Sequence, residues 1–102
     1  AARAVELAPS QAEAHDLLGW GAWLTGDAAR AEEELAQALA LDPRLASAWY
    51  HRAAMWAAQG RAMAAREAYM RAVVLDPSGF YGARAAKALR EMQACSGPLE
   101  GR

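Results

Sequence analysis

The sequence predicts an all-α protein built from antiparallel pairs of helices. Hydrophobic residues form 55% of the chain, but alanine supplies 29 of the 102 residues, so large apolar side chains are few. This composition suits helices that pack closely against other helices. Residues that favour strands are scarce, because isoleucine is absent and Thr25 is the only threonine. The third observation is an internal repeat, which places the helices along the chain.

The same pattern of residues recurs at a fixed interval along the chain. The triplets Leu-Ala-Pro, Leu-Asp-Pro and again Leu-Asp-Pro end at Pro9, Pro43 and Pro77, so each lies 34 positions after the one before. Gly26 and Gly60 have the same spacing, and the segment AEEELAQALALDP aligns with AREAYMRAVVLDP. The predicted units are the second helix of a truncated preceding repeat (1–9), repeat one (10–43), repeat two (44–77), a closing helix (78–94) and a flexible tail (95–102).

Proline, glycine and capping residues set the predicted helix ends. Proline disfavours a helical conformation in the preceding residue, so one helix ends before Pro43 and another before Pro77. Ser10 begins a capping-box pattern at the start of a helix. Gly26 supplies the turn within repeat one, and Asp27 is placed to cap the helix that follows. The predicted helices cover 1–8, 11–25, 28–42, 45–59, 62–76 and 79–94.

This pattern resembles the tetratricopeptide repeat family. The matching residues are Leu18, Gly19, Ala31, Leu35, Ala38 and Pro43 in repeat one, and Trp49, Ala53, Trp56, Ala65, Tyr69, Ala72 and Pro77 in repeat two. The resemblance covers about nine-tenths of the chain and departs from the family pattern at His15, Ala22 and Arg52. It implies a right-handed α-solenoid of about two and a half repeats, whose first helices line a concave face that binds peptides. Because the chain begins in the middle of a unit, we expect it to be a fragment of a longer protein.

Charge and composition exclude several kinds of partner. The net charge of −1 gives no electrostatic basis for binding nucleic acid or an anionic membrane. Cys95 is the only cysteine, so no internal disulfide can form. Neither a signal peptide nor a membrane-spanning apolar run is visible, which predicts a soluble, cytoplasmic chain.

No catalytic constellation is visible in the sequence. His15 and His51 lack the spacing of metal ligands. The acidic run Glu32 to Glu34 is typical of residues that stabilise the dipole of a helix start, rather than of a catalytic carboxylate pair. Gly19 and Gly21 follow no strand, so they are not a nucleotide-binding fingerprint. The sequence therefore predicts a protein that is not an enzyme and has no cofactor or metal.

A groove along the first helices is the predicted functional site. Helical spacing and the family resemblance place ten residues in it, which are Glu13, Asp16, Trp20, Trp23, Ser47, Tyr50, His51, Ala54, Tyr81 and Arg84. Its alanine floor and aromatic walls favour a protein or peptide ligand with apolar or aromatic side chains. A basic group of that ligand would meet Glu13 and Asp16. Family members that hold carboxylate tails of chaperones carry basic residues here, so Asp16 argues against that subtype.

Two other functions and one structural alternative remain open at the level of sequence. The chain could be a structural spacer within a larger protein. It could also self-associate weakly through Val5 and Leu7 of the truncated first unit. Trp23 could leave the groove and replace the aromatic residue that is missing at Ala22, because an indole is large enough to reach that position.

Overall fold

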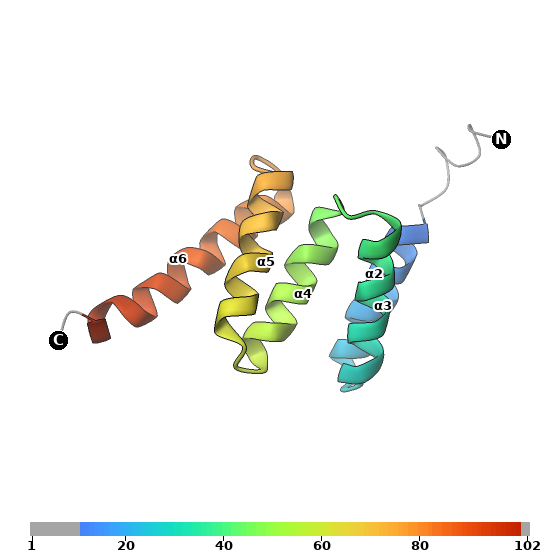
Figure 1. Cartoon of the computed structure of the whole chain (residues 1–102), viewed down its shortest axis with the longest axis horizontal. Coiled ribbons are helices and arrows are strands. Elements are labelled where there is room, and N and C mark those ends of the chain that lie inside the picture. The colour runs from blue at the N-terminus through green and yellow to red at the C-terminus, as the bar shows by residue number, and fades with distance from the viewer. Residues whose placement is uncertain (1–10, 101–102) are drawn as a thin grey trace.

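The computed structural model describes the backbone of residues 11–100 and the side chains of residues 11–93 (Figure 1). Within these residues the chain forms five α-helices and no strand, which confirms the predicted all-α class. The helices are α2 (Gln11–Leu24), α3 (Ala28–Leu41), α4 (Ala46–Ala58), α5 (Ala62–Leu75) and α6 (Phe80–Glu100). None of these helices is long and apolar enough to cross a membrane. The predicted helix over 1–8 and the Ser10 cap lie outside the described residues.

The helix ends recur at the interval seen in the sequence. Both bounds of α5 lie 34 positions after those of α3. Gly26 and Gly60 adopt φ angles of 93° and 84°, so each supplies the left-handed conformation that the turn between paired helices requires. The Asp27 carboxylate accepts a hydrogen bond from the backbone N–H of Arg30 at 3.2 Å, which confirms its predicted capping role.

Helix α6 is longer than the sequence predicts. It continues to Glu100, past residue 94, where the prediction ends the helix and begins a flexible tail. The Gly97-Pro98 pair favours a helix end. Pro98 lacks an amide hydrogen, so the helix loses one backbone hydrogen bond close to its end. The residues before Pro98 can still form the backbone hydrogen bonds of an α-helix.

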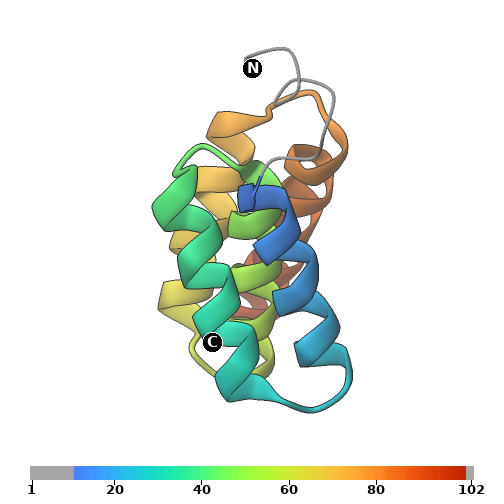
Figure 2. The same ribbon diagram turned by 90° about the vertical axis from the view of Figure 1, so that its right-hand side faces the viewer.

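Neighbouring helices pack in a row. Helix α2 contacts α3, and α4 contacts α5 and α6. The first helices of successive pairs also touch, α2 against α4 and α4 against α6. Seen along this row, α2 and α6 lie on one side and α3 and α5 on the other (Figure 2). We call the packing of the α2–α3 pair against α4 the first junction, and that of the α4–α5 pair against α6 the second junction.

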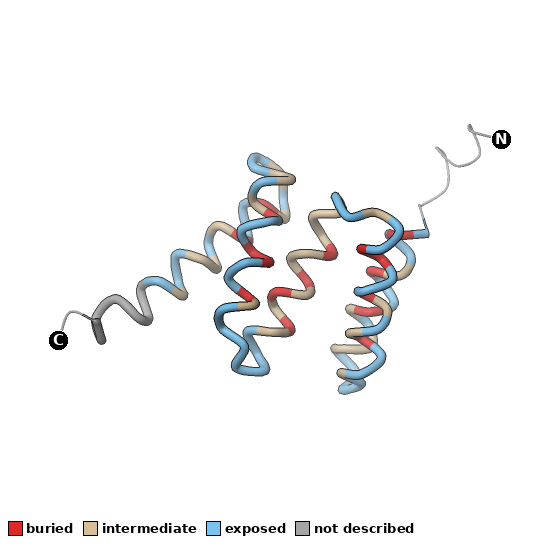
Figure 3. Tube along the Cα trace, viewed as in Figure 1, coloured by how far each residue is buried: buried red, intermediate tan, exposed pale blue. Residues whose placement is uncertain are grey.

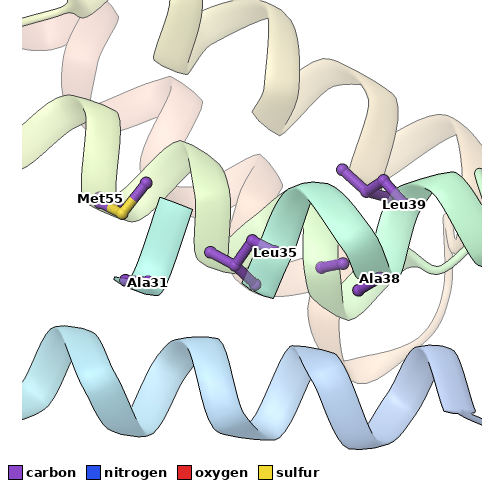
Figure 4. Packing of buried hydrophobic residues seen from close by; sticks show 6 residues of the cluster. Ala31, Leu35, Ala38, Leu39 and Met55 are labelled. Carbon is purple, nitrogen blue, oxygen red and sulfur yellow. The ribbon is translucent and has the colours of Figure 1, made fainter. Parts of the chain in front are cut away.

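Two alanine-rich clusters form the core, and their residues lie on the helix faces that meet other helices (Figure 3). The first cluster consists of Ala31, Leu35, Ala38, Leu39, Ala48 and Met55 (Figure 4). The second consists of Ala53, Ala65, Ala68, Tyr69, Ala72 and Ala85. Trp49 and Trp56 pack against both clusters, as expected for residues on the packing positions.

Gly19 lies at a close approach between α2 and α3. A Cβ atom on this residue would lie 2.9 Å from Cγ of Leu35 and 3.1 Å from the carbonyl oxygen of Ala31. These separations are shorter than side chains normally allow. Gly19 therefore permits the contact between the two helices, as the sequence predicts.

Candidate functional site

Asp16 is the centre of a buried polar network between α2 and α4. Asp16 is buried, with only 3% of its surface exposed. The Ser47 hydroxyl donates a hydrogen bond to Oδ2 of Asp16 at 2.6 Å. Nδ1 of His51 lies 2.8 Å from Oδ1 of the same carboxylate. Both oxygens of the carboxylate are therefore hydrogen-bonded within the protein.

The helical spacing of α4 explains why this network forms. Ser47 and His51 are four residues apart, so their side chains project from the same face of the helix. Asp16 faces them from α2, and a carboxylate removed from water requires such partners. Because a carboxylate accepts hydrogen bonds, Nδ1 of His51 carries the proton that is donated to Asp16.

Three aromatic rings surround the imidazole of His51. Trp20 of α2 stacks on it, with ring centres 4.5 Å apart and planes inclined by 18°. Tyr50 of α4 and Tyr81 of α6 present their edges to it, at 5.7 Å and 5.6 Å. The His51 cluster, as we name it, therefore consists of Asp16, Trp20, Ser47, Tyr50, His51 and Tyr81. Six of the ten residues predicted for the groove thus come together, from three first helices.

Burial corrects the predicted roles of two cluster residues. The sequence predicts that Asp16 meets a basic group of the ligand, but it is buried and both of its oxygens are occupied. His51 is predicted to be a polar residue facing the groove, but it is only 6% exposed. Among the described residues, the only hydrogen bond of its ring is the one from Nδ1 to Asp16. The imidazole is therefore a buried ring that joins α4 to α2, rather than a polar group that faces the groove.

The other four predicted groove residues differ in burial and surroundings. Glu13 is exposed in the first turn of α2, and Ala54 is half-buried on α4. Trp23 is half-buried and packs against the first core cluster together with Ala22. This contact agrees with the alternative in which the indole replaces a missing aromatic residue. The exposed Arg84 lies over the ring of Phe80, with its guanidinium 4.8 Å from the ring centre.

A hollow of about 310 Å³ borders the cluster on the side of α6. It is lined by Tyr50, Tyr69, Arg84, Lys87, Ala88 and Glu91. The sequence assigns Tyr69 to the core, and it is indeed buried, but its ring also lies 5.8 Å from that of Tyr50. Burial raises the pKa of the Tyr69 hydroxyl, and the nearby Tyr50 and Glu91 raise it further.

The arrangement of serine, histidine and aspartate is not that of a nucleophile and its base. In nucleophilic catalysis by serine, the imidazole must accept the proton of the hydroxyl. Here the Ser47 hydroxyl donates to Asp16 instead, and no hydrogen bond joins it to His51. Among the described residues, no group of three or more histidine, cysteine or acidic side chains is placed to hold a metal ion.

The acidic residues of α3 act across helices rather than at the helix start. Helix α3 begins at Ala28, so the first turn contains no acidic residue, contrary to the predicted dipole role. Glu34 lies 2.6 Å from Nδ1 of His15 on α2. Glu32 accepts hydrogen bonds from Arg61 at 3.2 Å and from the indole of Trp56 at 3.4 Å. These carboxylates link α3 to its neighbours.

Arg52 occupies its place on α4 at a visible cost. Its guanidinium lies 4.6 Å from the ring centre of Trp56, while its Nε atom is buried without a hydrogen-bond partner among the described residues. Burial lowers the pKa of Arg52, and the negative charge of Glu32 opposes part of that change.

The partnership between Asp16 and His51 escaped the sequence analysis, although a signal was present. The two residues are 35 positions apart, one more than the repeat length. Such a pair falls on facing sides of successive first helices. A carboxylate and an imidazole with this separation are candidates for a hydrogen bond across the junction.

Comparison with known proteins yields no relative, since no family model, no curated protein and no solved structure matches the chain.

Proposed function

We propose that the chain is a non-catalytic protein–protein interaction module of the tetratricopeptide type, a right-handed solenoid that binds a peptide or a partner helix over the His51 cluster. The constant offset between the ends of α3 and α5 and the row of contacts between α2, α4 and α6 support the repeat assignment. One observation carries the functional part. Side chains from three successive first helices converge on a single imidazole, that of His51.

The chemistry of the cluster favours a particular kind of ligand. Trp20, Tyr50 and Tyr81 are all half-buried, so each retains exposed ring surface for an apolar or aromatic side chain. A basic side chain would meet Glu13 rather than Asp16, because only Glu13 is exposed.

Partner capture with matched variants tests this proposal. The full chain would be immobilised and used to recover binding proteins from an extract of its native cell. We expect a Trp20→Ala and Tyr81→Ala double variant to lose most of the recovered protein. A Leu24→Ala variant should retain it, because Leu24 is an exposed residue of α2 outside the cluster. Equal recovery by the double variant would contradict the proposal.

A structural spacer is the second candidate, favoured by the internal satisfaction of the network. Groups of this chain donate a hydrogen bond to each oxygen of the Asp16 carboxylate, and Trp20 stacks on His51. If the cluster serves only to hold α2 against α4, the Trp20→Ala change lowers the melting temperature and leaves partner capture intact. Self-association through Val5 and Leu7, the third possibility from sequence, concerns residues outside the described part of the chain.

A further inference from the structure

The hollow beside the His51 cluster is polar and has an excess of positive charge. Its lining comes from three helices and consists of Tyr50 of α4, Tyr69 of α5, and Arg84, Lys87, Ala88 and Glu91 of α6. Two of these residues are cations, one is a carboxylate and two are tyrosines. A larger hollow between α5 and α6 differs in chemistry, because its wall includes Met63, Met70 and Met92. The smaller hollow is therefore the one whose side chains can recognise a charged group.

Tyr69 adds a hydroxyl that lacks a hydrogen-bond partner within the described part of the chain. The residue is only 6% exposed, and it belongs to the second core cluster as well as to the lining of the hollow. Burial raises the pKa of its hydroxyl, and so do Tyr50 and Glu91, which line the same hollow, so the group is protonated at neutral pH. It makes no hydrogen bond to another described residue, although buried hydroxyls usually have a partner. A ligand atom that accepts this hydrogen would be that partner.

Arg84 and Lys87 bring two positive charges to the hollow from one helix. Neither forms an ion pair with a described residue, although Glu91 lies four positions after Lys87 on the same helix. Arg84 contacts the ring of Phe80 through its guanidinium, and such a contact uses none of the hydrogen-bond donors in the guanidinium plane. Two cations and one buried hydroxyl therefore border the same hollow, and all three are suited to an anionic oxygen.

We infer that this hollow binds the carboxylate of an aspartate or glutamate side chain in the partner segment that lies over the His51 cluster. The inference rests on the proposed function, because Tyr50 belongs both to the cluster and to the hollow. The carboxylate accepts the hydroxyl hydrogen of Tyr69 and pairs with Arg84 and Lys87. A carboxylate matches the single positive charge by which the lining exceeds neutrality. A phosphate group has about two negative charges at neutral pH, so Glu91 would repel it more strongly.

A library of peptides displayed on phage tests this inference with the full chain as the target. The peptides are fused through their C-terminus, so only a side chain can supply the carboxylate. We expect the selected peptides to combine an aromatic residue with an acidic one. Synthetic copies in which an amide side chain replaces the acidic one should bind at least about tenfold more weakly, because the charge-assisted hydrogen bonds are lost. In NMR spectra of chain labelled at the tyrosine rings, the acidic peptide should shift the signal of Tyr69, and its amide copy should not.

Two double variants with the same change in net charge provide the matched comparison. Arg84→Gln combined with Lys87→Gln should weaken the acidic peptide by at least about tenfold. Arg66→Gln combined with Arg90→Gln should change its affinity by less than about twofold, because both residues are exposed and lie outside the lining. All four positions are exposed, so circular dichroism should show that both double variants keep the fold.

Two single variants examine the other groups of the lining. Tyr69→Phe should weaken the acidic peptide by about threefold or more and leave the amide copy unaffected, because only the carboxylate uses the hydroxyl strongly. The phenylalanine ring fills the same place in the core. Glu91→Gln should strengthen the acidic peptide, because it removes the one negative charge of the lining.

Several outcomes would overturn the inference. The selected peptides could lack an acidic residue, the amide copy could bind equally well, or the two double variants could weaken the acidic peptide to the same extent. Tighter binding by a copy with phosphoserine at the acidic position would contradict a carboxylate site. A library that yields no peptide also counts against the inference, whereas the proposed function is judged by partner capture. Peptides without an acidic residue that shift the Tyr81 signal would support the proposed function alone, so the two failures are distinguishable.

Discussion

Gly19 and Gly21 of helix α2 allow the energetic cost of separating α2 from α3 to be measured. Alanine at either position removes the same intrinsic penalty of glycine in a helix, about 0.5–1 kcal/mol. At Gly21 nothing lies within 4 Å of the added Cβ atom, so Gly21→Ala should stabilise the protein by that amount. At Gly19 the Cβ atom would meet Leu35, the backbone of Ala31 and Glu34 at 2.9, 3.1 and 3.2 Å.

The cost at Gly19 is that of overpacking. The carbonyl of Ala31 belongs to the backbone of α3, so the helices must move apart, at a typical cost of about 1–3 kcal/mol. Because the gain in helix propensity is common to both variants, the difference between them isolates this cost. Gly19→Ala should therefore be less stable than Gly21→Ala by about 1–3 kcal/mol, or at least about 4 °C in melting temperature.

Urea unfolding followed by far-UV circular dichroism gives both free energies under identical conditions. The helix content of the folded variants should be unchanged, which separates a loss of stability from a loss of structure. If Gly19→Ala is as stable as Gly21→Ala, α2 and α3 do not approach each other as closely as described.

Three further predictions concern buried polar groups. Asp16→Ala should destabilise the protein by about 2–4 kcal/mol, because Ser47 and His51 lose their charged acceptor, whereas Ser47→Ala should cost about 1 kcal/mol; urea unfolding measures both. Because the pKa of Tyr69 is raised in the folded state, the unfolded chain loses this proton first. Stability should therefore fall as the pH rises above about 10, and Tyr69→Phe should reduce that loss when urea midpoints are compared between pH 9 and 11. Arg52→Leu should raise the melting temperature by a few degrees. It removes the buried Nε atom that has no partner among the described residues, and the free energy gained exceeds the stabilisation lost with the guanidinium–indole contact.

Helix ends were the most predictable part of the fold, because single residues with strong local preferences fix them. Gly26 and Gly60 adopt the left-handed conformation that their place in the repeat requires. Pro43 and Pro77 likewise follow the ends of α3 and α5. Local preference was less informative at Pro98, where the helix continues through a residue that disfavours it.

Burial within the candidate site was harder to predict, because it depends on the neighbouring helix rather than on the residue itself. Asp16 looks like a solvent-exposed acid on an amphipathic helix. Only the position of α4 shows that Ser47 and His51 meet it. The same holds for Trp23. Its indole could lie in the groove or replace the aromatic residue missing at Ala22, and only the packing against the first core cluster distinguishes the two positions. Residue types therefore predicted the members of the cluster better than their roles.

The contrast between the two junctions has a consequence for motion. The hydrogen bonds that Ser47 and His51 donate to Asp16 are directional, so they hold α2 and α4 at one relative angle. The second junction is bordered by methionine side chains, which change rotamer at little cost and impose no such angle. Directional hydrogen bonds therefore fix the angle at the first junction, whereas side-chain packing alone fixes it at the second. We expect hydrogen exchange to show α6 opening at a lower free energy than α2 to α5, with the bending of the row concentrated at its last helix.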